Sequence, residues 1–333
     1  MPPSLQPNEV IKQFVVHVVV PILDVVLSPL TLIAGIWLKI VRRVGVYRMK
    51  MSRWIFNRIG VFPIRDHYYE PAFNPRHLHR PLTEERNLPG INLNVEGQLE
   101  LLERFDYAGE LDRIPRRATE AATFFYDNPN FPPGDSEYLY SVVRYYKPRS
   151  ILEVGSGFST LIMQRALACN AVNDSSYRCT LRCIEPFEMP WLGAVKGVDL
   201  IRGQIENLDA SLVEELEAND ILFIDSSHVV RPQGDVLRIF LQLLPMLRSG
   251  VLVHVHDIFT PRDYPREWLV DEVRIWSEQY LLEAFLSCNS RFRVLGALNF
   301  LSVHYPDRLA AKFPVFREKL GKCNPGSIWL QVE

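Results

Sequence analysis

Residues 150–160 read SILEVGSGFST, and the elements that this stretch predicts indicate the architecture of a large part of the chain. Residues 150–154 are a short apolar run between Lys147-Pro148 and Gly155, which is typical of a buried strand. Gly155 and Gly157 allow a sharp turn. Residues 158–168 are then expected to form a helix. A strand that leads through a glycine turn into a helix is the repeating unit of a parallel sheet.

The same alternation of apolar strands and helices continues beyond this stretch. The expected strands are residues 150–154, 179–185, 198–202, 220–225 and 250–257, and the expected helices are residues 134–146, 158–168, 208–216, 232–247 and 268–286. The tail adds a strand over 292–295, a candidate strand over 298–303, a helix near 307–320 and a last strand over 327–332. We therefore expect an α/β fold, a doubly wound and mostly parallel seven-stranded sheet with an antiparallel hairpin at one edge.

The composition is that of an ordinary globular protein, with 47% hydrophobic and 23% charged residues in a chain of 333. The 37 basic and 39 acidic side chains nearly cancel, so no nucleic-acid partner is expected. The five cysteines are odd in number and form no CxxC pair, which argues against a disulfide framework or a zinc site and favours reduced thiols in the cytoplasm. Composition leaves a homo-oligomer open.

The first 60 residues are more basic and more apolar than the rest. They hold eight Lys and Arg side chains against Glu9 and Asp24, and residues 14–38 form an apolar run about as long as a bilayer requires. This run could span the membrane, which would keep the basic cluster of residues 39–58 on the cytoplasmic side. It could also lie in the membrane plane as an amphipathic hairpin broken at Pro21 and Pro29, or pack as a helical pair on the body or on a second subunit. Residues 10–58 are therefore a candidate contact with the inner membrane, and the expected location is cytoplasmic, with or without attachment to the cytoplasmic face.

Residues 61–130 form a connecting segment that is rich in proline and aromatic residues. Regular elements should be short here, and one helix is expected over residues 94–110. The segment could act as a lid, as a dimerisation arm or as a coat over one face of the body. We expect three parts in all: an apolar, basic helical part at 1–60, the connecting segment at 61–130 and the α/β domain at 131–333.

Polar side chains follow several of the expected strands at their carboxyl ends, where open α/β sheets bind ligands. A glycine turn at a helix N-terminus offers free N–H donors, and a carboxylate after the second strand can hold ribose hydroxyls. The residues are Glu153 and the turn at 155–157 at the end of the first expected strand, Glu185 at the end of the second, Asp225 and His228 at the end of the fourth, and His254, His256 and Asp257 at the end of the fifth.

Residues 153–160, EVGSGFST, resemble motif I of the class I S-adenosylmethionine-dependent methyltransferases. They lack the third glycine of the dinucleotide-binding GxGxxG pattern, and an acid such as Glu153 just before the turn is typical of the methyltransferases. The resemblance covers about residues 131–333 and implies S-adenosylmethionine as the cofactor. The cofactor-binding residues that it implies are Glu153, Gly155, Ser156 and Gly157 at the methionine end, Glu185 at the ribose, Gln204 near the adenine, and Asp225.

The segments IDSSH at 224–228 and HVHDI at 254–258 resemble, more narrowly, metal-dependent sugar O-methyltransferases and related bacterial enzymes. The resemblance implies His228 as a general base, with Asp225 and Asp257 as orienting groups or as ligands of a divalent cation, Mg²⁺ or Mn²⁺. His256 stands where those enzymes carry an acid, so the implied metal set is Asp225, His256 and Asp257, which suits Mn²⁺ better than Mg²⁺. A site without metal, in which an aspartate polarises His228, is the other interpretation.

The expected function is O-methylation of a hydroxyl on a small molecule or a saccharide. The loop at 258–268 carries Arg262 and Arg266 and could close over an anionic or sugar-bearing acceptor. The alternative is a catalytically inactive methyltransferase-like protein that serves as a scaffold or binds a partner at the membrane.

Overall fold

The computed structural model describes residues 12–333 apart from residues 68, 72–73, 120–121 and 188. The chain divides into two compact units, one that ends at His79 and one that runs from Arg80 to Glu333. We call them the N-terminal unit and the C-terminal unit. Most of the connecting segment expected from the sequence, from residue 80 onward, belongs to the C-terminal unit.

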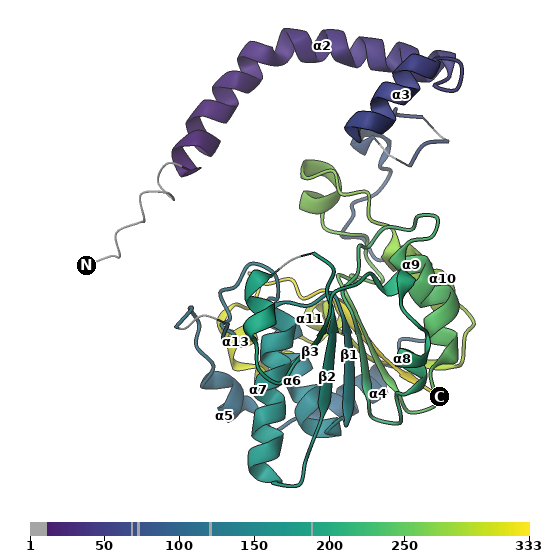
Figure 1. The fold of residues 1–333 in the computed structure, drawn as a ribbon. Helices are drawn as coiled ribbons and strands as arrows, with labels where there is room; N and C mark the ends of the chain where they lie inside the picture. Colours follow the sequence, from purple (N-terminus) through teal and green to yellow (C-terminus); the bar gives the residue numbers. More distant parts are fainter. Residues whose placement is uncertain (1–11, 68, 72–73, 120–121, 188) are drawn as a thin grey trace. The chain divides into compact units, whose positions relative to one another are not determined.

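The C-terminal unit is built around one seven-stranded sheet with the strand order β3-β2-β1-β4-β5-β7-β6 (Figure 1). Strand β7 runs antiparallel to β5 and β6, and the other neighbouring strands are parallel. This arrangement confirms the doubly wound, mostly parallel sheet with an antiparallel edge. The strands are β1 Ser150–Val154, β2 Thr180–Ile184, β3 Asp199–Ile201, β4 Ile221–Ile224, β5 Leu252–His256, β6 Phe292–Ala297 and β7 Ser327–Val332.

Strand β1 lies in the middle of the sheet and sets the position of the ligand crevice. Its Ile151 is in register with Leu181 of β2 on one side and with Ile221 of β4 on the other. The chain runs outward from β1 through β2 to β3 and then returns to β4, so the strand order reverses between β1 and β4. Such a switch point leaves a crevice at the carboxyl ends of the strands.

Helices cover both faces of the sheet, α6 and α7 on one face and α8, α9 and α10 on the other (Figure 1). Each face has its own apolar core, because neighbouring residues of a strand such as Leu222 and Phe223 point to opposite sides. The helix that begins with α9 continues to Met246 through a π-helical and a 3-10 turn. The helices are α4 Val95–Glu103, α5 Ala108–Asp112, α6 Asp135–Tyr146, α7 Phe158–Asn173, α8 Ser211–Glu214, α9 Asp235–Arg238, α10 Glu278–Leu286, α11 Leu298–His304, α12 Pro306–Lys312 and α13 Pro314–Glu318.

The prediction of a single helix over residues 268–286 is wrong for its first half. Helix α10 begins only at Glu278, after a π-helical turn at Glu267–Asp271 and an irregular stretch in which Val273 has a φ of +57°. The backbone N–H groups of Ser277 and Glu278 donate to the carbonyl of His228, which lies in a different loop. Local periodicity cannot reveal a partner that is so far away in sequence.

Three other expected elements differ from the structure. Residues 298–303, a candidate strand, belong to helix α11, because a short apolar run does not by itself distinguish a strand from a helix. The helix expected over 94–110 is divided into α4 and α5, and the one near 307–320 is divided into α12 and α13. The second division falls at Pro314, which has no N–H to continue the preceding helix.

The N-terminal unit contains a long helix, Lys12–Val44, in which an 18-residue window reaches a mean hydropathy of 2.2. It consists mainly of a π-helical turn at Val15–Val19 and of α2 Val20–Val44, and α3 Lys50–Ile59 follows it. The interpretation of this segment as an amphipathic hairpin broken at the prolines is therefore wrong. Pro29 deprives the carbonyl of Val25 of its helical donor, and the hydroxyl of Ser28 donates to that carbonyl at 2.9 Å instead.

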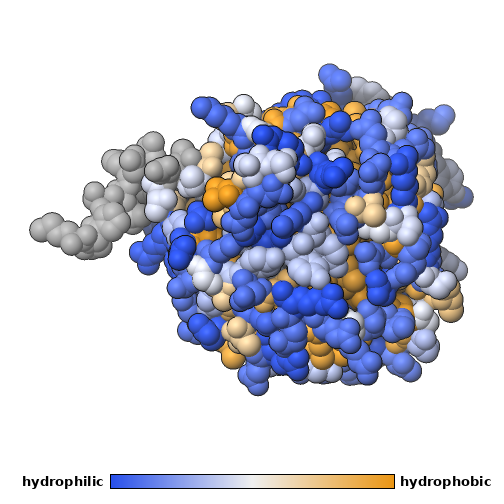
Figure 2. Space-filling view, turned by 90° about the horizontal axis from the view of Figure 1, so that it is seen from below, coloured by the Kyte–Doolittle hydropathy of each residue, from blue (hydrophilic) through white to orange (hydrophobic). Residues whose placement is uncertain are grey.

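The surfaces of the two units differ in polarity. The face of the C-terminal unit in Figure 2 is mostly hydrophilic, with apolar residues in small groups. In the long helix nearly every apolar side chain is exposed, and Val25 retains 72% of its accessible surface. Exposed apolar surface of this extent is typical of a segment that has a partner or a membrane around it.

Candidate active site

Gly155 lies where the carboxyl ends of strands β1, β2 and β4 meet. Its φ is +79°, and its N–H donates to the carbonyl of Ile184 at the end of β2. A Cβ at this position would lie 1.9 Å from the carbonyl oxygen of Asp225, just after β4. No side chain fits there, so the residue must be glycine for the loop to pass so close to β4.

Gly157 lies in a different environment. Its φ of −178° lies outside the left-handed region that favours glycine, and a Cβ would meet only the methyl group of Met189, at 3.8 Å. The fold itself therefore leaves room for a side chain at this position. That room opens into a hollow at the carboxyl ends of the strands.

Glu153 lies beneath this loop in the core. It is fully buried and accepts hydrogen bonds from the hydroxyls of Ser159 and Thr160, both at 2.6 Å, and from the thiol of Cys183 at 2.9 Å. Burial raises the pKa of Glu153 to about 7, although these hydrogen bonds act in the opposite direction. Glu153 lines neither of the two hollows described next, so its contacts tie strand β1 to helix α7.

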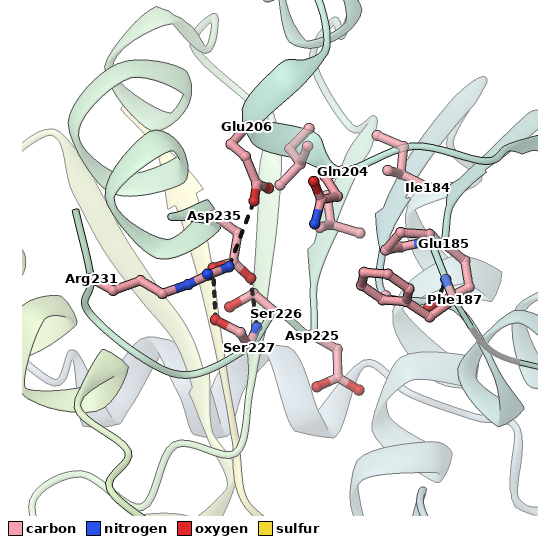
Figure 3. Close-up of a pocket in the computed structure, with 14 residues that line it drawn as sticks. Ile184, Glu185, Phe187, Gln204, Glu206, Asp225, Ser226, Ser227, Arg231 and Asp235 are labelled. Carbon is pink, nitrogen blue, oxygen red and sulfur yellow. Dashed lines mark hydrogen bonds and ion pairs between the residues drawn. The ribbon is translucent and has the colours of Figure 1, made fainter. Parts of the chain in front are cut away.

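Two hollows share Gly155, Glu185, Phe187 and Asp225 as lining residues. The smaller, of about 230 Å³, lies among the ends of β1, β2 and β4, and Figure 3 shows Gln204, Glu185 and Asp225 around it. The carboxylate of Glu185 accepts the N–H groups of Ser156 at 3.2 Å and Phe187 at 2.9 Å. On another side of this hollow, Ser227 is hydrogen-bonded to Asp235 and Arg231 pairs with Glu206 at 3.7 Å.

The larger hollow has a volume of about 570 Å³ and lies against the glycine turn. Ser156 and Gly157 line it on one side, and Asp257 and Trp268 line it as well. The hydroxyl of Ser156 is buried and has no hydrogen-bond partner within the described part of the chain. An unsatisfied buried hydroxyl in the wall of a hollow is a position where a bound ligand can supply the missing partner.

Asp225, His228 and Asp257 come together beside the larger hollow. One ligand atom from each lies within 4.8 Å of the others. The Nε2 atom of His228 is 3.3 Å from Asp225 Oδ1 and 3.4 Å from Asp257 Oδ2. The two aspartates directly follow the parallel strands β4 and β5, whose carboxyl ends meet at one edge, while His228 reaches back from its loop with a φ of +61°.

Glu278 holds the ring of His228 on its Nδ1 side, and this residue was not among those predicted from the sequence. The Nδ1 atom of His228 lies 2.8 Å from Glu278 Oε2, and the fully buried Glu278 also accepts the hydroxyl of Ser226 at 3.0 Å. The ring packs on Trp276 with 4.3 Å between centroids. Burial acts to lower the pKa of His228, but the bonds to Asp225 and Glu278 and the nearby charges raise it well above its ordinary value.

The pKa values of the two aspartates shift in opposite directions. Burial raises the pKa of Asp257. Burial is also the largest single effect on Asp225, but the hydrogen bond from His228 and the charges of His256 and His228 together outweigh it and lower the pKa of Asp225. The site therefore concentrates three carboxylates around one imidazole, which favours a bound positive charge.

His256 lies beside this group and is not part of it. Its Nε2 atom is 3.6 Å from Asp257 Oδ1, its ring lies 5.0 Å from that of Phe131, and it lines the larger hollow. The implied set of Asp225, His256 and Asp257 thus differs from the cluster in the structure, which has His228 in place of His256. His254 stacks on Phe223 at 4.0 Å within the sheet, and burial lowers its pKa well below the ordinary value.

The arginine that lines the larger hollow is Arg274, and nothing in its local sequence marks it. Its guanidinium packs against the rings of Trp268 and Trp276, at 4.8 and 4.6 Å from their centroids, and its Nε pairs with Glu272 at 2.5 Å. Arg262 and Arg266, the residues expected to meet the acceptor, line a separate hollow of about 280 Å³. From the loop expected to close over an acceptor, only Trp268 lines the larger hollow.

Comparisons with known proteins agree with the motif at the glycine turn. Residues 152–258, from β1 to just past β5, match the family model of a methyltransferase domain. An uncharacterized protein of Archaeoglobus fulgidus is 27% identical over 175 residues, which are 48% of this chain and 76% of that protein.

Two solved structures are similar at low identity. An O-methyltransferase from Bacillus cereus in complex with SAH has a TM-score of 0.37 and 16% identity, over 71% of this chain and 90% of its own. An O-methyltransferase from Streptomyces achromogenes, involved in tomaymycin synthesis and in complex with SAM, has a TM-score of 0.36 and 16% identity, over 70% of this chain and 89% of its own.

Proposed function

Because the C-terminal unit carries a class I S-adenosylmethionine-dependent methyltransferase domain, we propose that the protein methylates a hydroxyl of a small-molecule or saccharide acceptor. The observation that carries this proposal is the position of Asp225. This residue lies in both hollows at the glycine turn and also belongs to the cluster with His228 and Asp257. Cofactor and acceptor would thus meet at one carboxylate.

The residues around the two hollows fit the cofactor. In the smaller hollow the Glu185 carboxylate would accept the ribose hydroxyls, with Gln204 near the adenine (Figure 3). In the larger hollow the free space at Gly157 and the unsatisfied hydroxyl of Ser156 would receive the methionine end. When bound, S-adenosylmethionine supplies an electrophilic methyl group on a cationic sulfur.

We infer that His228 removes the proton of the acceptor hydroxyl through Nε2. Glu278 fixes the ring from the Nδ1 side, and Asp225 and Asp257 orient it from the other. A base must be unprotonated, whereas the carboxylates raise the pKa of His228. A positive charge bound against Asp225 and Asp257 would offset the carboxylates and lower that pKa toward neutrality.

The same three side chains fit a divalent cation. Two carboxylates and one imidazole, with a carboxylate behind the imidazole, form a donor set common in metal sites. Such a set suits Mn²⁺ better than Mg²⁺, which prefers oxygen ligands. If a cation is present, Asp225, His228 and Asp257 would hold it. Because Nε2 of His228 would then be a ligand and could not accept a proton, the cation would replace His228 as the group that activates the acceptor hydroxyl.

We propose that the acceptor occupies the larger hollow and meets Arg274. Contact with both tryptophan rings restricts the guanidinium, so an acceptor that carries an anionic group finds a fixed partner there. The exposed part of Trp268 offers a face on which a sugar ring can pack. The inactive-scaffold alternative is not favoured, because it gives no reason for the cluster and the hollow to coincide.

We also propose that the long N-terminal helix attaches the enzyme to the cytoplasmic face of a membrane. The helix Lys12–Val44 has 33 residues, and the share of its apolar window buried inside the protein is 0%. The basic residues that follow it would remain on the cytoplasmic side.

Methyl transfer can be tested with the full chain in detergent micelles, tritium-labelled S-adenosylmethionine and a panel of saccharide and phenolic acceptors. Label that is stable to alkali is not a methyl ester, and its release by hydriodic acid, which cleaves methyl ethers, supports O-methylation. We expect His228→Ala to lower turnover by about 10²–10⁴ and to leave cofactor affinity unchanged. His304→Ala removes an exposed histidine and should have no effect. Loss of cofactor binding in His228→Ala, or unchanged turnover, would contradict the role of His228.

A further inference from the structure

The N-terminal unit has a hollow of about 750 Å³ beside the end of helix α2. Its lining is strongly basic. The charged and titratable side chains that line it are Lys39, Arg42 and Arg43 of α2, and Arg65, Asp66 and His67 after α3. A volume of this size accommodates a small polar ligand.

The positive charge of this hollow is only partly neutralised. Glu70 forms ion pairs with Arg42 and, at 3.3 Å, with Arg65. Lys39 and Arg43 are exposed and form no ion pair or hydrogen bond within the described part of the chain. Two cationic side chains one helical turn apart are therefore free to bind an anion.

The hollow lies at one end of the apolar run. Residues 14–38 rise about 37 Å as an α-helix, against about 30 Å for the hydrocarbon core of a bilayer. If residue 14 lies near one boundary of that core, Lys39 of an upright helix lies about 7 Å beyond the other boundary, within the headgroup region. Trp37, half exposed at the same level, is a residue type that favours this interface.

We propose that this hollow binds the phosphate of an anionic membrane-lipid headgroup. Lys39 and Arg43 supply the attraction, while Arg42 and Arg65, fixed by Glu70, hold the wall of the hollow in place. The proposal rests on the proposed membrane attachment of the long helix and adds a defined lipid site to it.

The test is a titration of the full chain, in dodecylmaltoside micelles, with dioctanoyl phosphatidylglycerol, followed by native mass spectrometry of the bound lipid. We expect one retained lipid per chain. Lys39→Gln and Arg43→Gln should each weaken binding about fivefold, the usual effect of one basic residue near an anionic lipid surface. Arg53→Gln and Arg58→Gln remove the same charge from exposed positions of α3 outside the hollow and should leave binding unchanged.

Three results would overturn the proposal. Equal losses in all four variants would indicate general attraction to the basic segment and no defined site. Equal affinity for dioctanoyl phosphatidylcholine would show that the negative charge of the headgroup is irrelevant. Displacement of the lipid by inorganic phosphate at the same concentration would show that the hollow is a free-anion site.

A separate measurement distinguishes this proposal from the attachment on which it rests. The wild-type chain and the Lys39→Gln/Arg43→Gln variant should both float with neutral phosphatidylcholine vesicles, because the apolar helix alone drives insertion. Failure of both to float would refute the membrane attachment, and with it a bilayer lipid as the ligand. Cofactor binding, measured by calorimetry, reports on the catalytic proposal independently.

Discussion

Gly155 and Gly157 stand two residues apart in the glycine turn, yet they constrain the protein differently. A side chain at Gly155 would collide with the backbone after β4, whereas one at Gly157 would enter the larger hollow. Gly155→Ala should therefore lower the free energy of unfolding by at least about 3 kcal/mol. Gly157→Ala should change it by less than about 1 kcal/mol and weaken S-adenosylmethionine binding about tenfold or more. Urea unfolding and calorimetric titration measure the two effects; equal losses of stability would contradict the distinction.

Which histidine completes a metal site with Asp225 and Asp257 depends on which one faces the two carboxylates. In the structure it is His228, with His256 at the side. If the cluster binds Mn²⁺, as measured by calorimetry, His228→Ala should abolish that binding and His256→Ala should retain it. Glu278→Ala should weaken it about 10- to 100-fold, the usual effect of removing a carboxylate that supports a ligand. Mn²⁺ binding that is lost in His256→Ala would instead support the ligand set implied by the resemblance, Asp225, His256 and Asp257.

Some of the site residues could be anticipated, and others could not. Gly155 and Asp225 each follow a predicted strand, so the rule that polar residues at strand ends line the crevice is enough to find them. Glu278 and Arg274 are close to Asp257 and His228 only because the irregular stretch before α10 turns back toward the sheet. No pattern in a single sequence encodes that contact.

At the scale of the elements, α6 and α13 are held together by one buried carboxyl. Glu137 in the first turn of α6 accepts the N–H groups of Val315 at 2.8 Å, Phe316 at 2.9 Å and Gly134 at 3.2 Å. Burial nevertheless raises the pKa of Glu137 from 4.5 to about 7. Below pH 4.5 the group is protonated in both the folded and the unfolded chain, and between pH 4.5 and 7 only the unfolded chain ionises freely.

The contribution of Glu137 to stability is therefore lost as the pH rises through about 7. The loss amounts to at most about 3 kcal/mol, the equivalent of roughly two and a half pKa units. We expect the free energy of unfolding to fall less steeply between pH 5 and 8 in Glu137→Gln than in the wild type. Glu100→Gln changes an exposed carboxyl and should leave the slope unaltered. A slope that is the same in all three proteins would contradict the role of Glu137.

The strands of the parallel sheet were predictable because their side chains are buried on both faces and read as apolar runs with clear limits. Residues 298–303 satisfied the same description and are nevertheless helical. The deciding contact is tertiary: Leu298 and Leu301, one helical turn apart, are both fully buried in the core with α12 and α13. The long helix shows the converse case, in which two prolines suggested a break but the helical turns persist through both.

At the scale of the whole molecule, the boundary after residue 79 separates the candidate active site from the helix proposed to attach to a membrane. The sheet, both large cores and the two hollows of the candidate active site belong to the C-terminal unit. Residues 80–333 expressed alone should fold and bind S-adenosylmethionine as tightly as the full chain, while losing flotation with vesicles. Thermal unfolding, calorimetry and flotation test this; weaker cofactor binding would show that the N-terminal unit contributes to the site.

The central claim, that the two hollows at the glycine turn hold S-adenosylmethionine, is tested most directly by calorimetric titration of this cofactor into the full chain. We predict one site of micromolar affinity. In Gly157→Asp, where the new side chain would enter the larger hollow without meeting the backbone, binding should be lost while the melting temperature stays that of the wild type. A folded wild-type protein that does not bind the cofactor, or an equal affinity in both proteins, would contradict the account.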